Sequence, residues 1–456
     1  MRVLFLYKRH PVVPLGIMYL SSVLRRYKHK TKIAFIDDLD IVKEFKPNVI
    51  AASVMTGSQN KYLEIFIDLK KKFKFLSVMG GPHPTFFPEV IEEEGLDAII
   101  RGEAEDAFLE LVDKLKKKKD ITKIKNVWIK RNGKIYKNEM RSLVEDLDSL
   151  PFPDRGIVYE HEFWKKEPIR HFIAGRGCPY NCSYCFNEEY SKLYNGKGKR
   201  VRWRSVSNLI KEIKEVMKKY PSPIVYFQDD TFILNKVWLR EFSKEYKKEI
   251  NLPYHCHVRA NLVDEEICKL LKDSNCYSVH IAAETGDSEL RNKILNRNMS
   301  DEEIYNASKL LRKYKIKFMM QNMIGLPNGN LKNDFETLRM NIKCKPTYAW
   351  VSIFQPYPGT ELSRMAIDGG YCSGEDLDRI GEGFFDESVM KIENKNEVES
   401  LQKLFGITVE HPLLYYTGLI DILIRLPKVL TECTYSKWYK SFRNKKNNEL
   451  YGVKLN

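Results

Sequence analysis

The chain has 456 residues, of which 43% are hydrophobic, and this length and composition predict two or three folded domains rather than a disordered protein. Lysine and arginine number 76 against 61 acidic residues, a formal net charge of +15. The lysines are spread along many segments, so we interpret the excess as a basic surface and expect no nucleic-acid partner. Nine cysteines without a disulfide pattern, no signal peptide and no membrane-spanning run predict a cytoplasmic protein.

Residues 1–120 alternate short apolar strands with helices. This alternation predicts a parallel sheet covered on both faces, whose ligands bind at the carboxyl ends of the strands. Ser53 follows the third strand, and Gly80 and Gly81 follow the fourth. Glycines there let a backbone approach a flat ligand closely, although a simple tight loop is an equal alternative. The predicted strands are 3–6, 32–36, 49–53 and 75–79, and the predicted helices are 17–27, 41–45 and 62–72.

Residues 121–167 read as a connector. Residues 126–137 predict a β-hairpin that turns at Asn132-Gly133, because this dipeptide favours the tight turn that joins two strands. An extended, proline-bearing segment follows at 146–153.

Residues 168–375 repeat a strand and a helix about six times, which predicts an incomplete (β/α)6 barrel. Barrels of this kind collect chemistry on the loops that follow the strands. Asp229 and Asp230 follow the second strand, Glu284 the fourth and Gly325 the fifth. The predicted strands are 171–174, 224–228, 254–257, 278–282, 318–325 and 349–355.

Cys178, Cys182 and Cys185 form a C-x3-C-x2-C motif in a glycine-rich loop after the first of these strands. Three thiolates on one loop can hold three corners of a 4Fe–4S cluster and leave the fourth iron open to a small molecule. A zinc site would need a further ligand pair, and the sequence has no second C-x2-C. Burial of three cysteines by chance is the weaker alternative, because reduced thiols rarely gather on such a loop.

This loop, with the aromatic Tyr184 before its last cysteine, resembles the signature of the radical S-adenosylmethionine (SAM) superfamily. The resemblance implies that the open iron chelates SAM and that reductive cleavage yields a 5′-deoxyadenosyl radical. An external electron donor of the flavodoxin or ferredoxin type would supply the electron. The resemblance also implies that several side chains and one glycine contact SAM: Tyr184, Asp229, Asp230, Glu284, Arg291 and Gly325. For Asp229 and Asp230 the alternative role is to cap the next helix, and for Arg291 the alternative is a position on the surface.

The first 120 residues resemble a Rossmann-like cobalamin-binding domain. Ser53-Val54-Met55 matches the serine-x-leucine position of that family, with methionine for leucine, and Gly80-Gly81 matches its double glycine. The segments 14–20 and 101–105 match this domain where it precedes a radical SAM barrel. The D-x-H-x-x-G loop is absent, and His10 stands in the wrong register to replace its histidine. The resemblance therefore implies cobalamin held without a histidine ligand, or a domain that has lost it.

Residues 376–456 predict a mainly helical C-terminal region. Its apolar run at 413–427 is too short to span a bilayer with ease. We expect core packing there, with peripheral membrane association or substrate contact as the alternative.

Together these features predict a cobalamin-dependent radical SAM C-methyltransferase that acts on an unactivated carbon of a small-molecule, lipid-linked or peptide substrate. Cyclisation, rearrangement or carbon–carbon coupling, with cobalamin redox-active or absent, is the first alternative. A corrinoid-binding sensor with a vestigial barrel is the alternative from another class. A tRNA methylthiotransferase is disfavoured, because it needs a second cysteine trio near its start and residues 1–177 contain no cysteine.

Overall fold

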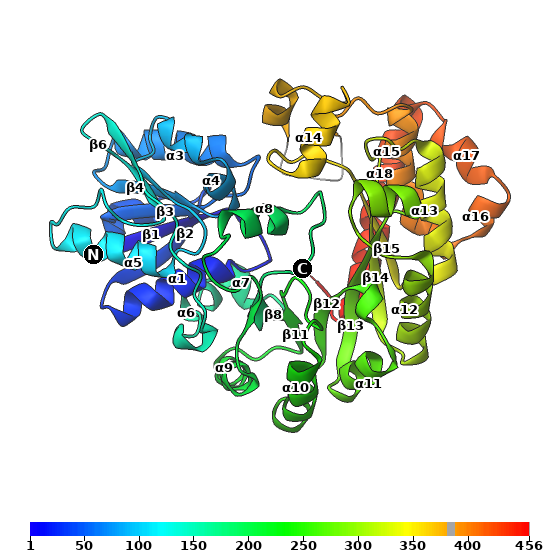
Figure 1. Cartoon of the computed structure of the whole chain (residues 1–456), viewed down its shortest axis with the longest axis horizontal. Coiled ribbons are helices and arrows are strands. Elements are labelled where there is room, and N and C mark those ends of the chain that lie inside the picture. Colours follow the sequence, from blue (N-terminus) through cyan, green and yellow to red (C-terminus); the bar gives the residue numbers. More distant parts are fainter. Residues whose placement is uncertain (381–387, 456) are drawn as a thin grey trace. The chain divides into compact units, whose positions relative to one another are not determined.

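The structure is a computed structural model, and it describes residues 1–380 and 388–455 (Figure 1). The chain forms two compact units. The first contains Met1–Glu167 and Glu189–Arg204, and the second contains Pro168–Glu188 and Ser205–Asn456. The chain therefore leaves the first unit, returns to it for one short segment, and leaves it again.

A seven-stranded sheet forms the centre of the first unit, in the order β2-β1-β3-β4-β5-β6-β7. Its first five strands are parallel, as the alternating sequence predicts, and β6 and β7 are antiparallel. β5 was not predicted, because three residues carry no readable periodicity. The strands are β1 (Arg2–Tyr7), β2 (Lys30–Phe35), β3 (Val49–Ser53), β4 (Leu76–Gly80), β5 (Ala98–Ile100), β6 (Val127–Arg131) and β7 (Lys134–Lys137).

Helices lie on both faces of this sheet, α3 and α4 on one and α1 and α5 on the other (Figure 1). In α1 the buried residues Ile17, Met18 and Leu24 recur at helical spacing and pack inward, which is why this segment is helical. The helices of the first unit are α1 (Leu15–Arg26), α2 (Ile41–Phe45), α3 (Gln59–Lys70), α4 (Pro82–Phe86), α5 (Glu105–Lys116), α6 (Gly156–Tyr159) and α7 (Glu162–Lys165).

The predicted hairpin is present as β6 and β7. Asn132 and Gly133 have φ of +51° and +72°, the left-handed pair that a two-residue turn of type I′ requires. Because β6 pairs with β5, the hairpin extends the sheet of the first unit rather than only linking two domains.

The second unit is built on a six-stranded sheet in the order β15-β14-β13-β12-β11-β8. All five strand pairings are parallel, which confirms the predicted partial barrel. The strands are β8 (Ile169–Phe172), β11 (Ile224–Phe227), β12 (Tyr254–Val258), β13 (Cys276–Glu284), β14 (Lys317–Ile324) and β15 (Tyr348–Ile353). The short strand β9 (Gly175–Arg176) of this unit lies outside the sheet, and the short strand β10 (Arg202–Trp203) belongs to the first unit.

Helices follow these strands and cover the outer side of the barrel (Figure 1). Most begin at a capping side chain; Ser300 and Glu303, for example, form a reciprocal capping box. The helices from the cluster loop onward are α8 (Phe186–Leu193), α9 (Val206–Lys219), α10 (Lys236–Glu249), α11 (Glu265–Asp273), α12 (Asp301–Lys313), α13 (Leu331–Cys344) and α14 (Glu361–Asp368).

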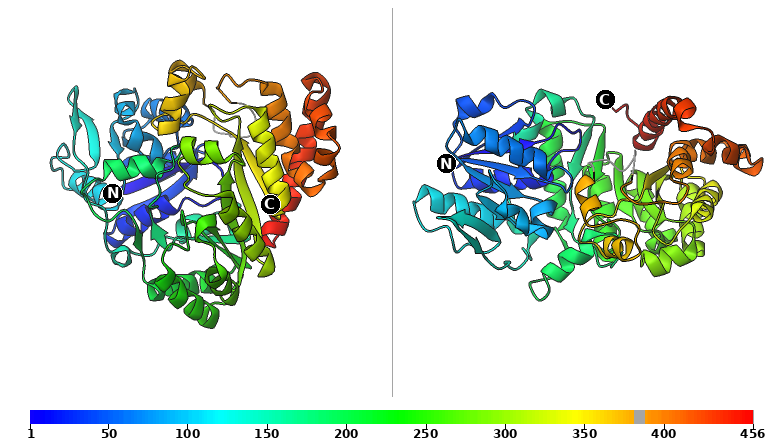
Figure 2. Two further views of the ribbon diagram at one scale, coloured as in Figure 1. Left: turned by 45° about the vertical axis from the view of Figure 1, so that its right-hand side comes forward. Right: turned by 90° about the horizontal axis from the view of Figure 1, so that it is seen from above.

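The C-terminal region is helical, as predicted: α15 (Lys395–Glu410), α16 (Leu413–Tyr416), α17 (Leu419–Ile424) and α18 (Lys428–Tyr451). Figure 2 shows α18 in red beside the last strands of the barrel. After this helix, Val453 and Leu455 join Tyr451 in packing against Ile169 and Ile224 at the starts of β8 and β11. In the described part of the chain, no helix is long and apolar enough to cross a membrane.

Candidate functional site

The three motif cysteines lie on one loop of the second unit, between β9 and α8. Cys182 is buried, and Cys178 and Cys185 are partly exposed. The backbone N–H of Cys185 donates to the carbonyl of Cys182 at 3.0 Å, so the last two cysteines share one tight turn. Gly177 has φ of +88°, a conformation that a residue with a side chain rarely adopts, where the loop begins. One short loop therefore carries all three sulfur ligands.

Two cationic side chains lie beside Cys182, the buried member of the trio. Burial raises the pKa of the Cys185 thiol to about 11 and also raises the pKa of Cys178, so a thiolate here needs cationic partners. The guanidinium groups of Arg259 and Arg297 supply some of this charge, each with Nη1 3.8 Å from Sγ of Cys182. Three thiols, backed by two guanidiniums that offset anionic charge, fit an iron–sulfur cluster.

The sequence alone assigned no role to Arg259 or to Arg297. Arg297 lies in an irregular stretch after a short π-helix (η4, Leu290–Ile294), where no periodic pattern marks it. Its separation from the cysteine loop in the sequence gives no signal that the two meet. The sequence-level signal for Arg259 was its place after a strand of the barrel.

Tyr184, Glu284 and Arg297 form a buried polar group beside the cluster loop. The Tyr184 hydroxyl donates to Oε1 of Glu284 at 2.7 Å, and Arg297 Nη1 donates to the same hydroxyl at 2.9 Å. Nη1 of Arg297 also lies 3.8 Å from Oε1 of Glu284. The structure thus brings together two residues that the resemblance assigned to SAM and adds a third.

The backbone of Glu284 is strained. Its φ is +67°, and the pairing of β13 with β14 shifts register between Ala282 and Glu284. For a residue with a side chain this conformation costs roughly 1–2 kcal/mol. Strain of this kind gathers at functional positions, where it aims a side chain that regular backbone would direct elsewhere.

The two aspartates after β11 have different surroundings. Asp229 is buried, and its carboxylate accepts the backbone N–H of Ala174 at 3.0 Å and of Gly175 at 2.5 Å. Burial raises the pKa of Asp229 to about 7, against the opposing effect of these hydrogen bonds. Asp230 is exposed. Asp229 therefore fixes the backbone that leads into the cluster loop. Partial burial of its own carboxyl group raises the pKa of Asp230, against the opposing effect of a hydrogen bond with Asn187.

Arg291 is fully buried and is held by its own neighbourhood. Its Nε donates to the carbonyl of Met299 at 2.9 Å, its Nη1 donates to the carbonyl of Thr285 at 3.0 Å, and its Nη2 pairs with Asp301. These contacts anchor the segment that follows Glu284. A contact of Arg291 with SAM stays a prediction.

Gly325 lies after β14 with φ of +66°, and a side chain there would come within 2.9 Å of Ile392 Cδ1. Its N–H donates to Oδ1 of Asp334 at 3.1 Å. Asp334 is buried, and this burial raises the pKa of its carboxyl group to about 7. The turn that was predicted to contact SAM is thus held by a carboxyl group from α13.

In the first unit, Ser53, Gly80 and Gly81 meet at the carboxyl edge of the sheet. Ser53 and Gly80 are register partners in β3 and β4. Gly81 has φ of +94°, and a Cβ there would lie 2.8 Å from both Ser53 Oγ and Val54 N. A Cβ on Gly80 would instead meet no atom closer than 3.8 Å. The two glycines therefore leave bare backbone at the edge where such sheets bind ligands, which suits the tail of cobalamin.

His10 lies in a loop and is exposed. Its Nδ1 accepts the backbone N–H of Val12 at 3.1 Å, and its carbonyl accepts the indole N–H of Trp164 at 2.8 Å. These contacts show that His10 belongs to a structured loop; that it does not ligate cobalt stays a prediction.

The segment 101–105 contains a buried ion pair of the first unit. Arg202 donates to both carboxylate oxygens of Glu103, at 2.9 and 3.1 Å, and to the carbonyl of Val144 at 2.6 Å. The side chains of Arg202 and Glu103 are only 4% and 10% exposed. Arg202 therefore holds the returning segment 189–204 to the sheet domain.

Two family models match the chain. Residues 172–340 match the radical SAM superfamily, and residues 1–112 match the B12 binding domain. An uncharacterized methyltransferase of Pyrococcus horikoshii is 30% identical over 369 residues, which cover 78% of this chain and 78% of that protein.

Solved structures share the fold. The radical SAM methyltransferase TsrM from Kitasatospora setae, with tryptophan substrate and a SAM analogue bound, aligns with a TM-score of 0.64 and 16% identity over 77% of this chain and 72% of its own. The cobalamin-dependent SAM radical enzyme OxsB with aqua-cobalamin bound aligns with a TM-score of 0.69 and 17% identity over 98% of this chain and 73% of its own. At such identities these likenesses show the fold.

Proposed function

Because the chain belongs to the radical SAM superfamily, in the class whose barrel follows a B12-binding domain, we propose that it methylates an unactivated carbon of its substrate. It is an enzyme of the methyltransferase type, and its cofactors are a 4Fe–4S cluster, SAM and cobalamin. The cluster and SAM supply a hydrogen-abstracting radical, and methylcobalamin supplies the methyl group. The observation that carries the proposal is the presence, in one chain, of the cysteine loop and of the glycine edge at Gly80 and Gly81.

The chain's own residues would hold and orient these groups. Cys178, Cys182 and Cys185 would ligate three irons, while Arg259 and Arg297 offset the charge of the sulfurs. Buried positive charge of this kind stabilises an anionic site because little water is present to screen it.

We assign SAM to the carboxyl ends of the strands that carry the polar residues. Glu284, presented by its strained backbone, and the exposed Asp230 would accept hydrogen bonds from SAM. Tyr184 would border adenine, and Gly325 would let the backbone approach it closely. Arg291 would hold the segment that follows Glu284 in place rather than contact SAM itself, because its guanidinium already makes three contacts within the protein.

The electron that starts the reaction would come from an external donor of the flavodoxin or ferredoxin type. The formal net charge of +15 suits an acidic one-electron carrier, because opposite charges speed the encounter of two proteins.

We propose that the C-terminal region contacts an anionic lipid surface, where the enzyme would find a lipid-linked or apolar substrate. If the region does not bind lipid, the substrate is instead a peptide or a soluble small molecule. The core-packing expectation holds for part of the apolar run, since Ile420 and Ile424 are buried. Tyr415 and Leu423 are partly buried against the same core. Most of the remaining apolar side chains of the run are exposed, as is Trp438 on α18, and cations flank them. The exposed apolar residues are Leu413, Tyr416, Leu419, Ile422, Leu426 and Trp438, and the exposed cations are Arg425, Lys437 and Lys440.

The lipid contact is tested by sedimentation with vesicles of phosphatidylglycerol or of phosphatidylcholine. We expect binding to the anionic vesicles only, and loss of binding in Leu413→Ser with Ile422→Ser. Val237→Ser is the matched control, because Val237 is 72% exposed on α10 and outside this region. Equal binding of the double variant and the wild type would contradict the proposal.

The methyl transfer itself is tested anaerobically with reconstituted protein, cobalamin and SAM that carries a trideuterated methyl group. Incubation with a lipid extract and with a small-molecule extract should give 5′-deoxyadenosine and a product that gains one labelled methyl group by mass spectrometry. Cys182→Ala should abolish both, while Cys268→Ala, a buried cysteine outside the loop, should retain both. Substrate turnover without a methyl gain, or turnover without bound cobalamin, would instead favour cyclisation, rearrangement or coupling.

A further inference from the structure

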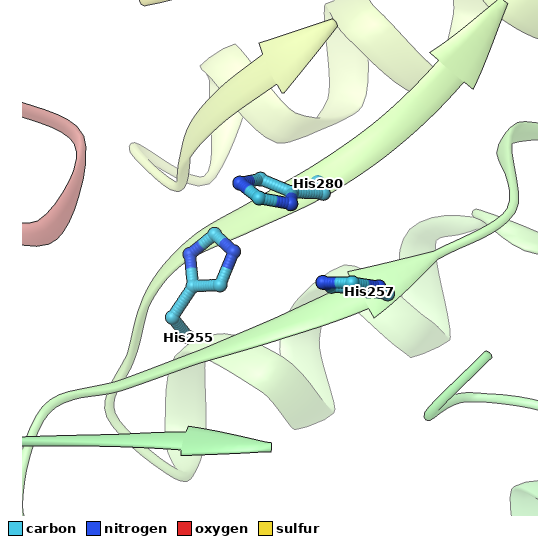
Figure 3. A group of neighbouring side chains, drawn as sticks. All are labelled: His255, His257 and His280. Carbon is cyan, nitrogen blue, oxygen red and sulfur yellow. The ribbon is translucent and has the colours of Figure 1, made fainter. Parts of the chain in front are cut away.

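Three histidines gather within the barrel sheet, outside the site described above. His255 and His257 belong to β12, and His280 belongs to β13 (Figure 3). Alternate residues of a strand share a face, and His257 is the register partner of His280, so the three rings project to the same side. Their ligand nitrogens all lie within 4.8 Å of one another.

All three rings are in the form that binds metals. Burial lowers the pKa of His257 to about 4, and burial also lowers the pKa of His255 and His280, with the neighbouring imidazoles adding to the effect. The rings are therefore neutral at pH 7, and each carries a nitrogen lone pair. A metal ion binds the neutral imidazole, so no proton has to be removed first.

His255 has an unpaired nitrogen. The residue is fully buried, and its Nδ1 lies 2.7 Å from the Ser278 hydroxyl. Its Nε2 is buried and has no hydrogen-bond partner among the described residues. A buried polar atom left in this state costs roughly 1–3 kcal/mol. A ring with one nitrogen fixed by a hydrogen bond and the other free has the arrangement of a metal-bound histidine.

Two tyrosine hydroxyls complete the surroundings. The hydroxyl of Tyr226 lies 2.6 Å from Nε2 of His257 and 3.5 Å from Nδ1 of His280, and the hydroxyl of Tyr451 lies 3.3 Å from Nε2 of His280. A hydrogen-bonded cluster of neutral rings is the alternative to a metal site. That cluster satisfies His257 and His280 but leaves Nε2 of His255 without a partner.

We propose that His255, His257 and His280 bind one divalent transition metal ion of the Zn²⁺ type. Tetrahedral coordination at ~2.0–2.1 Å sets the ligand nitrogens about 3.3 Å apart. Because the nitrogens lie within 4.8 Å of one another, each pair would close by at most about 1.5 Å. Nε2 of His257 would exchange the Tyr226 hydroxyl for the ion. Three imidazoles leave a fourth position, which would take water, and the ion would polarise that water.

The test measures metal content, so it does not depend on methyl transfer. Full-length, cobalamin-free protein with Cys178, Cys182 and Cys185 all replaced by alanine offers no cluster sulfurs. After incubation with Zn²⁺ and gel filtration, elemental analysis should find one zinc per chain, and titration with Co²⁺ should give the visible absorption of a tetrahedral site. His255→Gln and His280→Gln should each weaken binding roughly tenfold or more, while His10→Gln, in the exposed loop, should change nothing.

Tyr226→Phe guards against failure of the histidine variants to fold. It keeps the three imidazoles, releases Nε2 of His257 and should bind the ion at least as tightly as the parent. Absence of zinc and cobalt from both the parent and Tyr226→Phe would overturn the proposal. The proposal would also be overturned if the cysteine-free parent and a variant in which all three histidines are replaced held equal amounts of metal.

Discussion

Glu284 adopts a strained backbone conformation that destabilises the fold but places its carboxylate in the site. Its φ of +67° strains the backbone, and its carboxylate reaches Tyr184 and Arg297. We predict that Glu284→Ala and Glu284→Gly retain the cluster but weaken SAM binding by roughly tenfold to a hundredfold, because a charge-assisted hydrogen bond in a buried site contributes on the order of 1.5–3 kcal/mol. Anaerobic calorimetry with reconstituted protein measures this affinity.

The two variants separate strain from binding. Glycine adopts positive φ without penalty, so Glu284→Gly should melt at a higher temperature than Glu284→Ala. The control is Glu289→Ala, which removes an exposed carboxylate that pairs with the exposed Lys293. Unchanged SAM affinity in Glu284→Gly with a full cluster would contradict the assigned role.

Asp334 gives the protein a dependence on pH. Its carboxyl pKa is about 7 in the native state, because burial disfavours the charged form, and near 3.9 when unfolded. Between these values the native state binds the proton more tightly, so stability is lost as the pH rises from about 4 to about 7 and is constant above. We predict that Asp334→Asn lacks this component, so wild-type melting temperature falls relative to the variant between about pH 5 and pH 7.

Asp68→Asn is the control for this measurement. A hydrogen bond from Lys71 lowers the pKa of exposed Asp68, so its titration ends below that pH interval and its variant should run parallel to the wild type. A melting-temperature difference between wild type and Asp334→Asn that is independent of pH would show that Asp334 is charged throughout.

The sequence identified the polar residues of the site better than it identified their partners. Strand ends predict where Asp229, Asp230 and Glu284 lie, because the barrel topology places those ends together. The sequence could not predict that the Asp229 carboxylate would accept hydrogen bonds from the backbone of Ala174 and Gly175, because the direction of a side chain in a loop cannot be read from a pattern. Arg297 was missed because its contacts are made by an irregular segment with no pattern.

At the scale of elements, the ends of β3 and β4 form the candidate cobalamin edge. A side chain on Gly81 would collide with the Ser53 loop itself, so Gly81→Val would strain the protein with or without cobalamin. Gly80 is the sharper probe, because a Cβ there has room within the protein. We predict that Gly80→Val folds and keeps its cluster but loses most cobalamin, measured by absorption after gel filtration.

Gly374→Val serves as the control, because a Cβ at Gly374 meets no atom within 4 Å. His10→Ala should leave the cobalamin spectrum unchanged if no histidine ligates the cobalt. Full cobalamin retention by Gly80→Val would move the binding site away from this edge.

The elements themselves were largely readable from the sequence. Apolar runs of four or more residues predicted β1 to β4 and all six strands of the barrel within a few positions. The pattern failed where an element was too short, as at β5, and it could not assign the hairpin of β6 and β7 to a sheet, because pairing depends on contacts distant in the chain.

At the scale of the whole molecule, the segment 189–204 is bound into the first unit by the buried pair of Arg202 and Glu103. We predict that Glu103→Ala destabilises the protein by about 3–5 kcal/mol, because it leaves a guanidinium buried without its partner. Glu103→Leu combined with Arg202→Met should recover much of this loss. Urea unfolding followed by circular dichroism measures both variants.

The exposed pair of Asp68 and Lys71 provides the comparison, since Asp68→Ala should change the unfolding midpoint little. A double variant as unstable as Glu103→Ala would show that the pair contributes through its geometry rather than its charge.

The end of α18 has a consequence for how the protein is made. Tyr451, Val453 and Leu455 cover the starts of β8 and β11, and most of the second unit is encoded between these strands and that cover. A ribosome adds roughly 5–20 residues per second, so the first barrel strands wait on the order of tens of seconds for their lid. During that interval their apolar ends are open to chaperones and to other nascent chains, and a nonsense mutation at the codon of Tyr451 would leave them uncovered permanently.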